Sequence, residues 1–177
     1  MPRNWDEHFA QAAELDFTPS PLLVEAGEML PAGRALDLAC GAGRNALYLA
    51  ALGWRVVAVD SSPNALRILR ERAGGLAIET HLADLETGSF AIEPAGYDLV
   101  CDILYLQRDL FPRIREGVRP GGVAAVEVLL AGSRPRPFAM EPGELRAEFE
   151  GWKILYYSES PPPGGTHATA RLIARRA

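Results

Sequence analysis

The stretch of sequence that decides the fold is Arg34-Ala35-Leu36-Asp37-Leu38-Ala39-Cys40-Gly41-Ala42-Gly43-Arg44-Asn45-Ala46. It begins as a run typical of a β-strand, passes through two glycines and continues into a run typical of a helix. Glycines at 41 and 43 let the backbone turn and pass close to a ligand. The helix that follows would point its free N–H groups and the positive end of its dipole at that ligand. The stretch therefore predicts a strand, a ligand-binding turn and a helix.

Two classes of ligand use a turn of this kind. The segment from Gly41 to Ala46 matches the G-x-G-x-x-G/A pattern of dinucleotide sites, a pattern that is weak evidence by itself. Asp37 stands just before the turn, where its carboxylate would repel a pyrophosphate but attract a ligand with an ammonium and a sulfonium group. The charge favours S-adenosylmethionine, and an NAD-binding oxidoreductase remains the less favoured alternative.

Two further acids follow the next two predicted strands. Asp60 closes the second strand, where a carboxylate can accept hydrogen bonds from both ribose hydroxyls. Asp84 follows the third strand, where it can accept from an adenine amino group while Leu85 packs on the ring. Taken singly, each acid would serve equally well as a helix cap. Three acids at three successive strand ends favour a shared ligand.

Strand-like and helix-like runs alternate along nearly the whole chain, which is typical of an α/β fold with a doubly wound, mostly parallel sheet. The predicted strands are residues 35–39, 55–60, 76–82, 97–102, 123–129, 152–158 and 168–174, and the predicted helices between them are residues 44–52, 63–73, 106–117 and 143–150. Residues 161–165 leave no room for a crossover helix, so we expect the last strand to be antiparallel.

The N-terminal region is predicted to form two amphipathic helices, at residues 5–15 and 21–30, that cap the open end of the sheet. Prolines at 19 and 21 separate them. The sequence offers no internal repeat and no interdomain linker. We therefore expect residues 1–177 to form a single domain, with residues 1–31 as its N-terminal capping helices.

The composition indicates which partners and which cellular location to expect for the protein. With 177 residues, 48% hydrophobic and 23% charged, the chain resembles a soluble globular protein. Its net charge of −5 does not suit nucleic acid. No apolar run is long enough to cross a membrane, and no secretory signal is evident. Two cysteines indicate thiols in a reducing compartment, and three scattered histidines indicate no metal site. We expect a cytoplasmic protein.

These motifs together resemble the class I, Rossmann-like S-adenosylmethionine-dependent methyltransferases. The resemblance rests on the segment from Asp37 to Gly43, on Asp60, on Ala83-Asp84-Leu85, and on Val118-Arg119-Pro120-Gly121-Gly122 before a strand. It implies a seven-stranded sheet in the order 3-2-1-4-5-7-6. More narrowly, residues 43–50, 137–145 and 150–152 are similar to the tellurite-resistance methyltransferases. That group carries a His-Arg-bearing connection between its last two strands, whereas residues 161–165 are shorter here, with His167 beyond them.

The motifs and the resemblance give a set of candidate site residues. Those expected to bind the cofactor are Asp37, Ala39, Gly41, Gly43, Asn45, Asp60, Ser61, Asp84, Leu85 and Asp102. Those expected near the acceptor are Trp5, His8, Tyr105 and Arg134. Asp102 would equally serve as a cap for the helix that follows it. No residue is identified as a general base.

The sequence thus predicts a methyltransferase that uses S-adenosylmethionine and acts on a small soluble acceptor. The absence of an obligatory base suits a nucleophile that ionises readily, such as a thiol or a chalcogen compound. Since the motifs all belong to the cofactor half of the site, a non-catalytic S-adenosylmethionine-binding module is the alternative. The sequence does not determine the oligomeric state.

Overall fold

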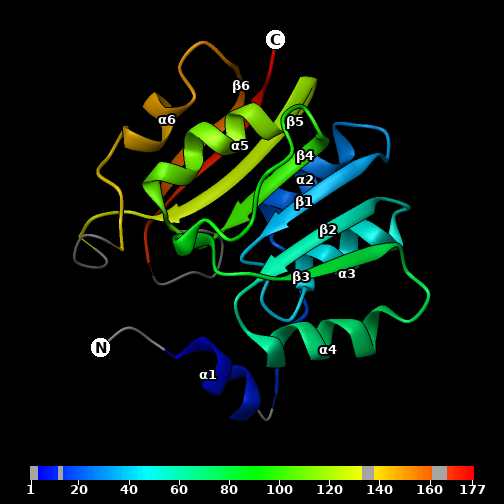
Figure 1. The fold of residues 1–177 in the computed structure, drawn as a ribbon. Helices are drawn as coiled ribbons and strands as arrows, with labels where there is room; N and C mark the ends of the chain where they lie inside the picture. The colour runs from blue at the N-terminus through cyan, green and yellow to red at the C-terminus, as the bar shows by residue number, and fades with distance from the viewer. Residues whose placement is uncertain (1–3, 12–13, 133–137, 161–166) are drawn as a thin grey trace.

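A computed structural model describes residues 4–11, 14–132, 138–160 and 167–177. Within these residues the strands form one seven-stranded sheet in the order β3-β2-β1-β4-β5-β7-β6 (Figure 1). The strands are β1 Arg34–Leu38, β2 Arg55–Asp60, β3 Ile78–Leu82, β4 Tyr97–Ile103, β5 Val118–Leu129, β6 Lys153–Ser160 and β7 Thr169–Arg175. Only β7 runs against its neighbours β5 and β6. The predicted strand order and the antiparallel last strand are confirmed.

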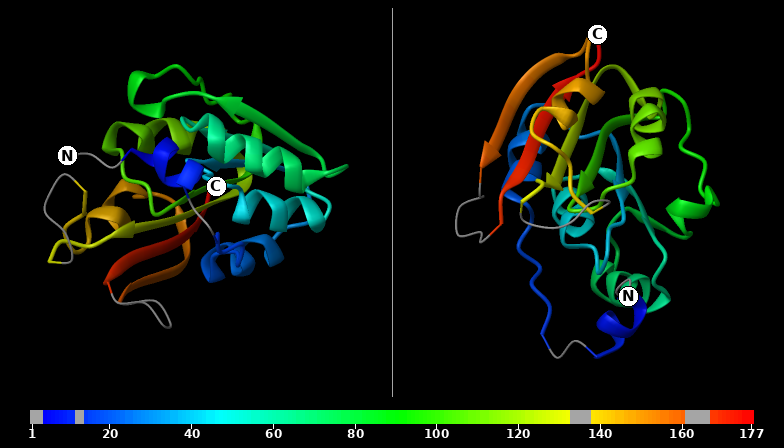
Figure 2. Two further views of the ribbon diagram at one scale, coloured as in Figure 1. Left: turned by 90° about the horizontal axis from the view of Figure 1, so that it is seen from below. Right: turned by 90° about the vertical axis from the view of Figure 1, so that its left-hand side faces the viewer.

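Helices cover both faces of the sheet, as the alternating pattern predicts (Figures 1 and 2). On one face lie α2 Pro21–Glu28, α3 Arg44–Ala51 and α4 Pro63–Ala73, whose apolar side chains join a core with the buried Trp54. On the other lie α5 Phe111–Gly117 and α6 Glu144–Glu148. Each face of the sheet therefore has its own hydrophobic core.

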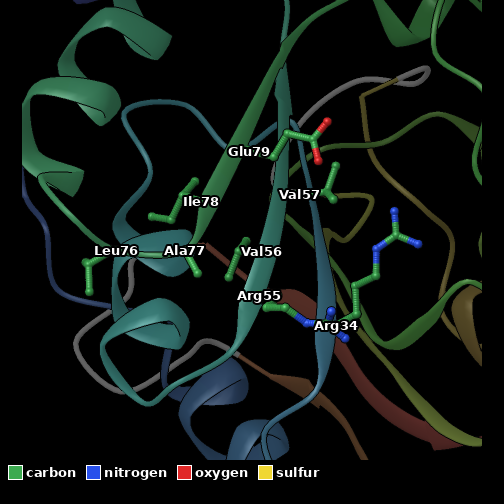
Figure 3. A pocket seen from close by; sticks show the side chains of 8 residues that line it. All are labelled: Arg34, Arg55, Val56, Val57, Leu76, Ala77, Ile78 and Glu79. Carbon is green, nitrogen blue, oxygen red and sulfur yellow. The ribbon is translucent and has the colours of Figure 1, made fainter.

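The connection from β3 to β4 contains no crossover helix, only the single 3-10 turn η1 Leu85–Thr87 and a loop. A shallow pocket of about 400 Å³ opens at the amino-terminal ends of β1, β2 and β3 (Figure 3). Arg34, Val57 and Glu79 are among its lining residues. Since ligands of such sheets bind at the carboxyl ends of the strands, this pocket is not the predicted cofactor site.

The N-terminal helices differ from the prediction. α1, Trp5–Gln11, lies beyond the carboxyl ends of the parallel strands and beside the start of α4 (Figures 1 and 2). It ends earlier than predicted, since Glu14 and Leu15 are not helical. α2 does not cap the open end of the sheet. It packs on a face, against β5 and β7, because Leu22, Leu23 and Ala26 are its buried side chains.

Two other boundaries differ for physical reasons. The predicted helix 106–117 is divided into the 3-10 turn η2, Arg108–Leu110, and α5, which starts beside Pro112, a residue well suited to the first turn of a helix. β5 begins at Val118, before the predicted residue 123, because the chain pairs with Tyr97, bulges out through Gly121 at a φ of 79° and pairs again at Val123.

None of the helices in the described ranges is both long enough and apolar enough to cross a lipid bilayer.

The aromatic cluster beneath α5 and α6 is the basis of a stability prediction. Phe149 is 1% exposed, and its ring lies edge-to-face with those of Phe111 and Trp152 at centroid distances of 6.2 and 5.4 Å. Phe149→Ala should therefore lower the free energy of unfolding by about 3–5 kcal/mol in urea denaturation. Leu52→Ala, at a side chain that is 50% exposed, is the matched control and should change it by less than about 0.5 kcal/mol. Equal effects of the two would contradict this account of the core.

Candidate active site

The carboxyl ends of four parallel strands bring the predicted acids to one edge of the sheet. β1 lies between β2 and β4, so Asp37 near the end of β1 is flanked by the chains that carry Asp60 and Asp102. Asp84 follows β3, the next strand outward. The strand order therefore places in one region the acids that are far apart in the sequence.

The turn after β1 adopts the strained conformation that its glycines predict. Gly41 and Gly43 have φ values of 56° and 85°, and Ala39 has a φ of 51° although it is not glycine. A Cβ on Gly43 would lie 2.3 Å from Leu69 Cδ1, so no other residue fits without displacing the α4 side chain. Such strain is typical of functional sites. The turn keeps the backbone of residues 39–43 close to the end of the sheet.

Asp60 is fixed by two backbone donors. Its Oδ2 accepts from the N–H of Gly41 and its Oδ1 from the N–H of Ser62, each at 2.8 Å. Burial raises the pKa of Asp60, while these hydrogen bonds oppose the shift. A carboxylate offers about four acceptor positions, so these contacts leave acceptor capacity for a hydroxyl donor from a ligand.

Asp37 and Asp102 are buried without full hydrogen bonding. Asp37 is 1% exposed, and its Oδ1 accepts from Cys101 Sγ at 3.4 Å. Among the described residues, neither its Oδ2 nor either oxygen of the fully buried Asp102 has a hydrogen-bond donor. Burial raises the pKa of Asp37 to about 7, and burial with the nearby Asp37 raises that of Asp102 well above its usual range. A cationic ligand would offset the free-energy cost of ionising each of these buried carboxylates.

At the predicted adenine subsite, the structure leaves Asp84 exposed but buries Leu85. Asp84 is exposed after β3, and its Oδ1 accepts from the N–H of Glu86, so it also caps η1. Leu85 is only 5% exposed and packs in the core on the α5 face. The carboxylate of Asp84 remains accessible, whereas the Leu85 side chain presents little surface to a ligand.

Asn45 is buried and its side chain is engaged by another part of the protein. Its Oδ1 accepts from the N–H of Ser20 at 2.9 Å, and Ser20 Oγ in turn lies 3.4 Å from Glu127 Oε2. Thr169 Oγ1 donates to the other oxygen of Glu127. This buried network was not predicted from the sequence, although a lone glutamate inside an apolar strand is the signal for it. Ser61 is exposed directly after Asp60.

The residues after β4 form the side on which the sequence predicts the acceptor. Tyr105 is half-buried, and its hydroxyl donates to Gln107 Oε1 at 2.8 Å. Gln107 Nε2 donates to the carbonyl of Leu85, which links this segment to the loop after β3. Leu104, which the sequence did not single out, is 51% exposed with a φ of 63°. Arg134, predicted near the acceptor, lies outside the described residues.

Trp5 and His8 lie on α1, beyond the ends of the strands. Their rings meet edge-to-face at 5.6 Å, and Trp5 is 51% exposed. The residue that reaches the glycine turn is Phe9, which was not predicted from the sequence. Phe9 packs so closely that a Cβ on Gly41 would be 3.1 Å from its Cζ.

Within the described ranges, no three His, Cys, Asp or Glu side chains are grouped to hold a metal ion. The site instead combines a tight glycine turn, a carboxylate with free acceptor positions for hydroxyls, and two buried carboxylates that favour positive charge. This combination is chemically suited to a ligand that carries positive charge and hydroxyl groups.

Comparisons with known proteins identify relatives of this chain. The probable S-adenosyl-L-methionine-dependent methyltransferase TehB of Haemophilus influenzae is 28% identical over 152 residues, which are 78% of this chain and 52% of that protein. A ubiquinone biosynthesis O-methyltransferase of Methylocella silvestris is 33% identical over 81% of this chain and 53% of its own length. The chain thus spans about half the length of these curated relatives.

A solved structure supports the fold. The crystal structure of TehB from Haemophilus influenzae superposes with a TM-score of 0.77 at 23% identity, covering 98% of this chain and 67% of that one. A family model described as tellurite resistance protein TehB matches residues 3–171. Because this match covers nearly the whole chain, the protein belongs to the TehB family.

Proposed function

We propose that this chain binds S-adenosylmethionine at the turn after β1 and transfers its methyl group to a small acceptor. The observation that carries the proposal is the pair of buried carboxylates, Asp37 and Asp102, beside a strained glycine turn: among the described residues, three of their four oxygens lack a donor. Membership of the TehB family and the names of the relatives support it.

Each part of the cofactor has a suitable group in the site. Asp37 and Asp102 would face the ammonium and sulfonium end, and Asp60 would accept from the ribose hydroxyls. Asp84 would accept from the adenine amino group. The backbone of Ala39, Gly41 and Gly43 would line the passage, with Ser61 beside the ribose. Asn45 and Leu85 would act by holding the neighbouring segments in place, since their side chains are already engaged.

The cofactor would supply an already activated methyl group, so the protein mainly has to align the acceptor and exclude water. Tyr105 and the exposed Leu104 stand at the end of β4, where an acceptor would enter. Burial and the surrounding acids raise the pKa of the Tyr105 phenol, so it stays neutral and can donate but not act as a base. A nucleophile that ionises readily, such as a thiol or a chalcogen compound, fits such a site.

We further propose that Trp5, His8 and Arg134 border the acceptor, and that the protein works in the cytoplasm without nucleic acid. The free, buried cysteines support the location, and the net charge of −5 supports the absence of nucleic acid as a partner.

An acceptor screen tests the reaction itself. With labelled S-adenosylmethionine, transfer should occur to small thiols or reduced chalcogen compounds, with the other product being S-adenosylhomocysteine. Transfer only to protein or nucleic acid would exclude a small acceptor. Binding without turnover across a broad panel would favour a non-catalytic binding module.

Calorimetry tests the cofactor site. The wild type should bind S-adenosylmethionine and S-adenosylhomocysteine, and binding of NADH alone would favour the oxidoreductase alternative. Asp60→Ala should weaken the affinity by about 1.5–3 kcal/mol for each charge-assisted hydrogen bond that is lost. Asp109→Ala removes an exposed acid after β4 and should leave the affinity unchanged. Circular dichroism checks that both variants are folded.

The pKa of Asp37 gives a pH prediction. Burial raises this pKa to about 7 in the folded protein, whereas an unfolded chain releases the proton near pH 4. The folded state therefore binds more protons between these values. The free energy of unfolding without ligand should fall as pH rises through this window, by up to about 1.4 kcal/mol per pH unit. Asp37→Asn should remove this part of the slope, and Asp109→Asn should not.

The affinity for the cationic cofactor should change in the opposite direction, because binding favours ionised Asp37. Between about pH 5.5 and 7, it should rise by up to about tenfold per pH unit in the wild type, and less in Asp37→Asn. A wild-type affinity that is independent of pH would contradict the placement of the ammonium group at Asp37.

A further inference from the structure

The helix α1 is joined to the rest of the protein by specific polar contacts. None of the described side chains in α1 is buried, so hydrophobic packing alone holds it weakly. Asp6 Oδ1 accepts from Ser62 Oγ at 2.7 Å and from the N–H of Asn64 at 3.0 Å. Its Oδ2 accepts from Asn64 Nδ2 at 3.0 Å. Asp6 thus joins α1 to the start of α4.

These contacts continue to the carboxylate expected to bind the ribose. Ser62 caps α4 by accepting from the N–H of Ala65, and its own N–H donates to Asp60 Oδ1 at 2.8 Å. The other oxygen of Asp60 accepts from the N–H of Gly41. A chain of hydrogen bonds therefore runs from Asp6 through Ser62 to Asp60 and the glycine turn.

A second contact reaches the same turn from α1. Phe9 lies one helical turn after Asp6, so both side chains leave the same face of the helix. Its ring packs on Gly41, at the other end of the Asp60 hydrogen bonds. Asp6 and Phe9 together hold α1 over the turn and over Asp60.

We propose that Asp6 is a positioning residue that latches α1 over the cofactor and thereby sets how fast the cofactor leaves. Hydrogen bonding fixes α1 to α4, and α1 carries Phe9 against the turn. When the latch is released, α1 moves away from Gly41 and Asp60 and the nucleoside exchanges with solvent. The proposal rests on the cofactor placement given under Proposed function.

The test compares Asp6→Ala with Glu7→Ala, which removes the neighbouring acid, whose side chain is exposed and accepts only from Gln11 within the described contacts. In the protein without ligand, amide hydrogen exchange over residues 5–11 should become faster in Asp6→Ala and stay unchanged in Glu7→Ala. This readout does not depend on cofactor binding.

The ligand readout is the dissociation rate of S-adenosylhomocysteine, measured by stopped-flow chase. Loss of charge-assisted hydrogen bonds in Asp6→Ala should raise this rate, and the KM for S-adenosylmethionine, about tenfold or more. The kcat at saturating cofactor should stay within about twofold, because Asp6 does not touch the reacting atoms. Asp6→Asn keeps one acceptor oxygen, so its dissociation rate and its KM should lie between those of the wild type and those of Asp6→Ala.

A double-mutant cycle with Asn64→Ala tests the contact directly, and the effects on the dissociation rate should be non-additive. Equal exchange and dissociation rates in Asp6→Ala, Glu7→Ala and the wild type would overturn the proposal. Loss of cooperative thermal unfolding in Asp6→Ala would also overturn it, since the contact would then stabilise the whole fold. If the wild type binds no S-adenosylhomocysteine, the proposed function fails, while hydrogen exchange still tests the latch.

Discussion

The burial of an incompletely hydrogen-bonded carboxylate at the end of the central strand is the constraint on which the site depends. Asp37 sits near the end of β1, between β2 and β4, with one oxygen that lacks a donor among the described residues. Burial raises its pKa to about 7, so the ligand-free protein bears a cost at neutral pH that a cation would remove. Buried polar groups in folded proteins are usually hydrogen-bonded, so a buried carboxylate that keeps this cost is a candidate for a functional group.

The strained turn follows from the same constraint. For a ligand to reach Asp37, the backbone after β1 must fold back tightly, and the left-handed residues Ala39, Gly41 and Gly43 provide that path. Asp60 then fixes the turn by accepting from Gly41, so a carboxylate expected to bind ligand also shapes the loop. A change at Asp60 would therefore alter the turn as well as the proposed contacts with the ligand.

The site has less helical cover on one side than on another. No crossover helix covers the sheet between β3 and β4, where η1 and a loop take its place. At the carboxyl ends of the strands, by contrast, α1 is held over the site by Asp6 and Phe9. The buried network of Ser20, Asn45 and Glu127 anchors the segment that leads from α1 to α2. The N-terminal region is thereby tied both to the sheet and to the glycine turn.

The sequence by itself determined the parts that local patterns encode. Alternating runs predict the strands and helices, the glycines predict the turn, and the short connection at residues 161–165 predicts the antiparallel β7. The acids at the strand ends are also read from the sequence, and the family resemblance added the strand order that brings them together. Only the tertiary structure decided which side chains meet. Asn45 turns to Ser20, Leu85 enters the core, and Asp6 and Phe9 reach α4 and Gly41 from α1. Those contacts join residues far apart in the chain, and their partners depend on packing directions that no local pattern records.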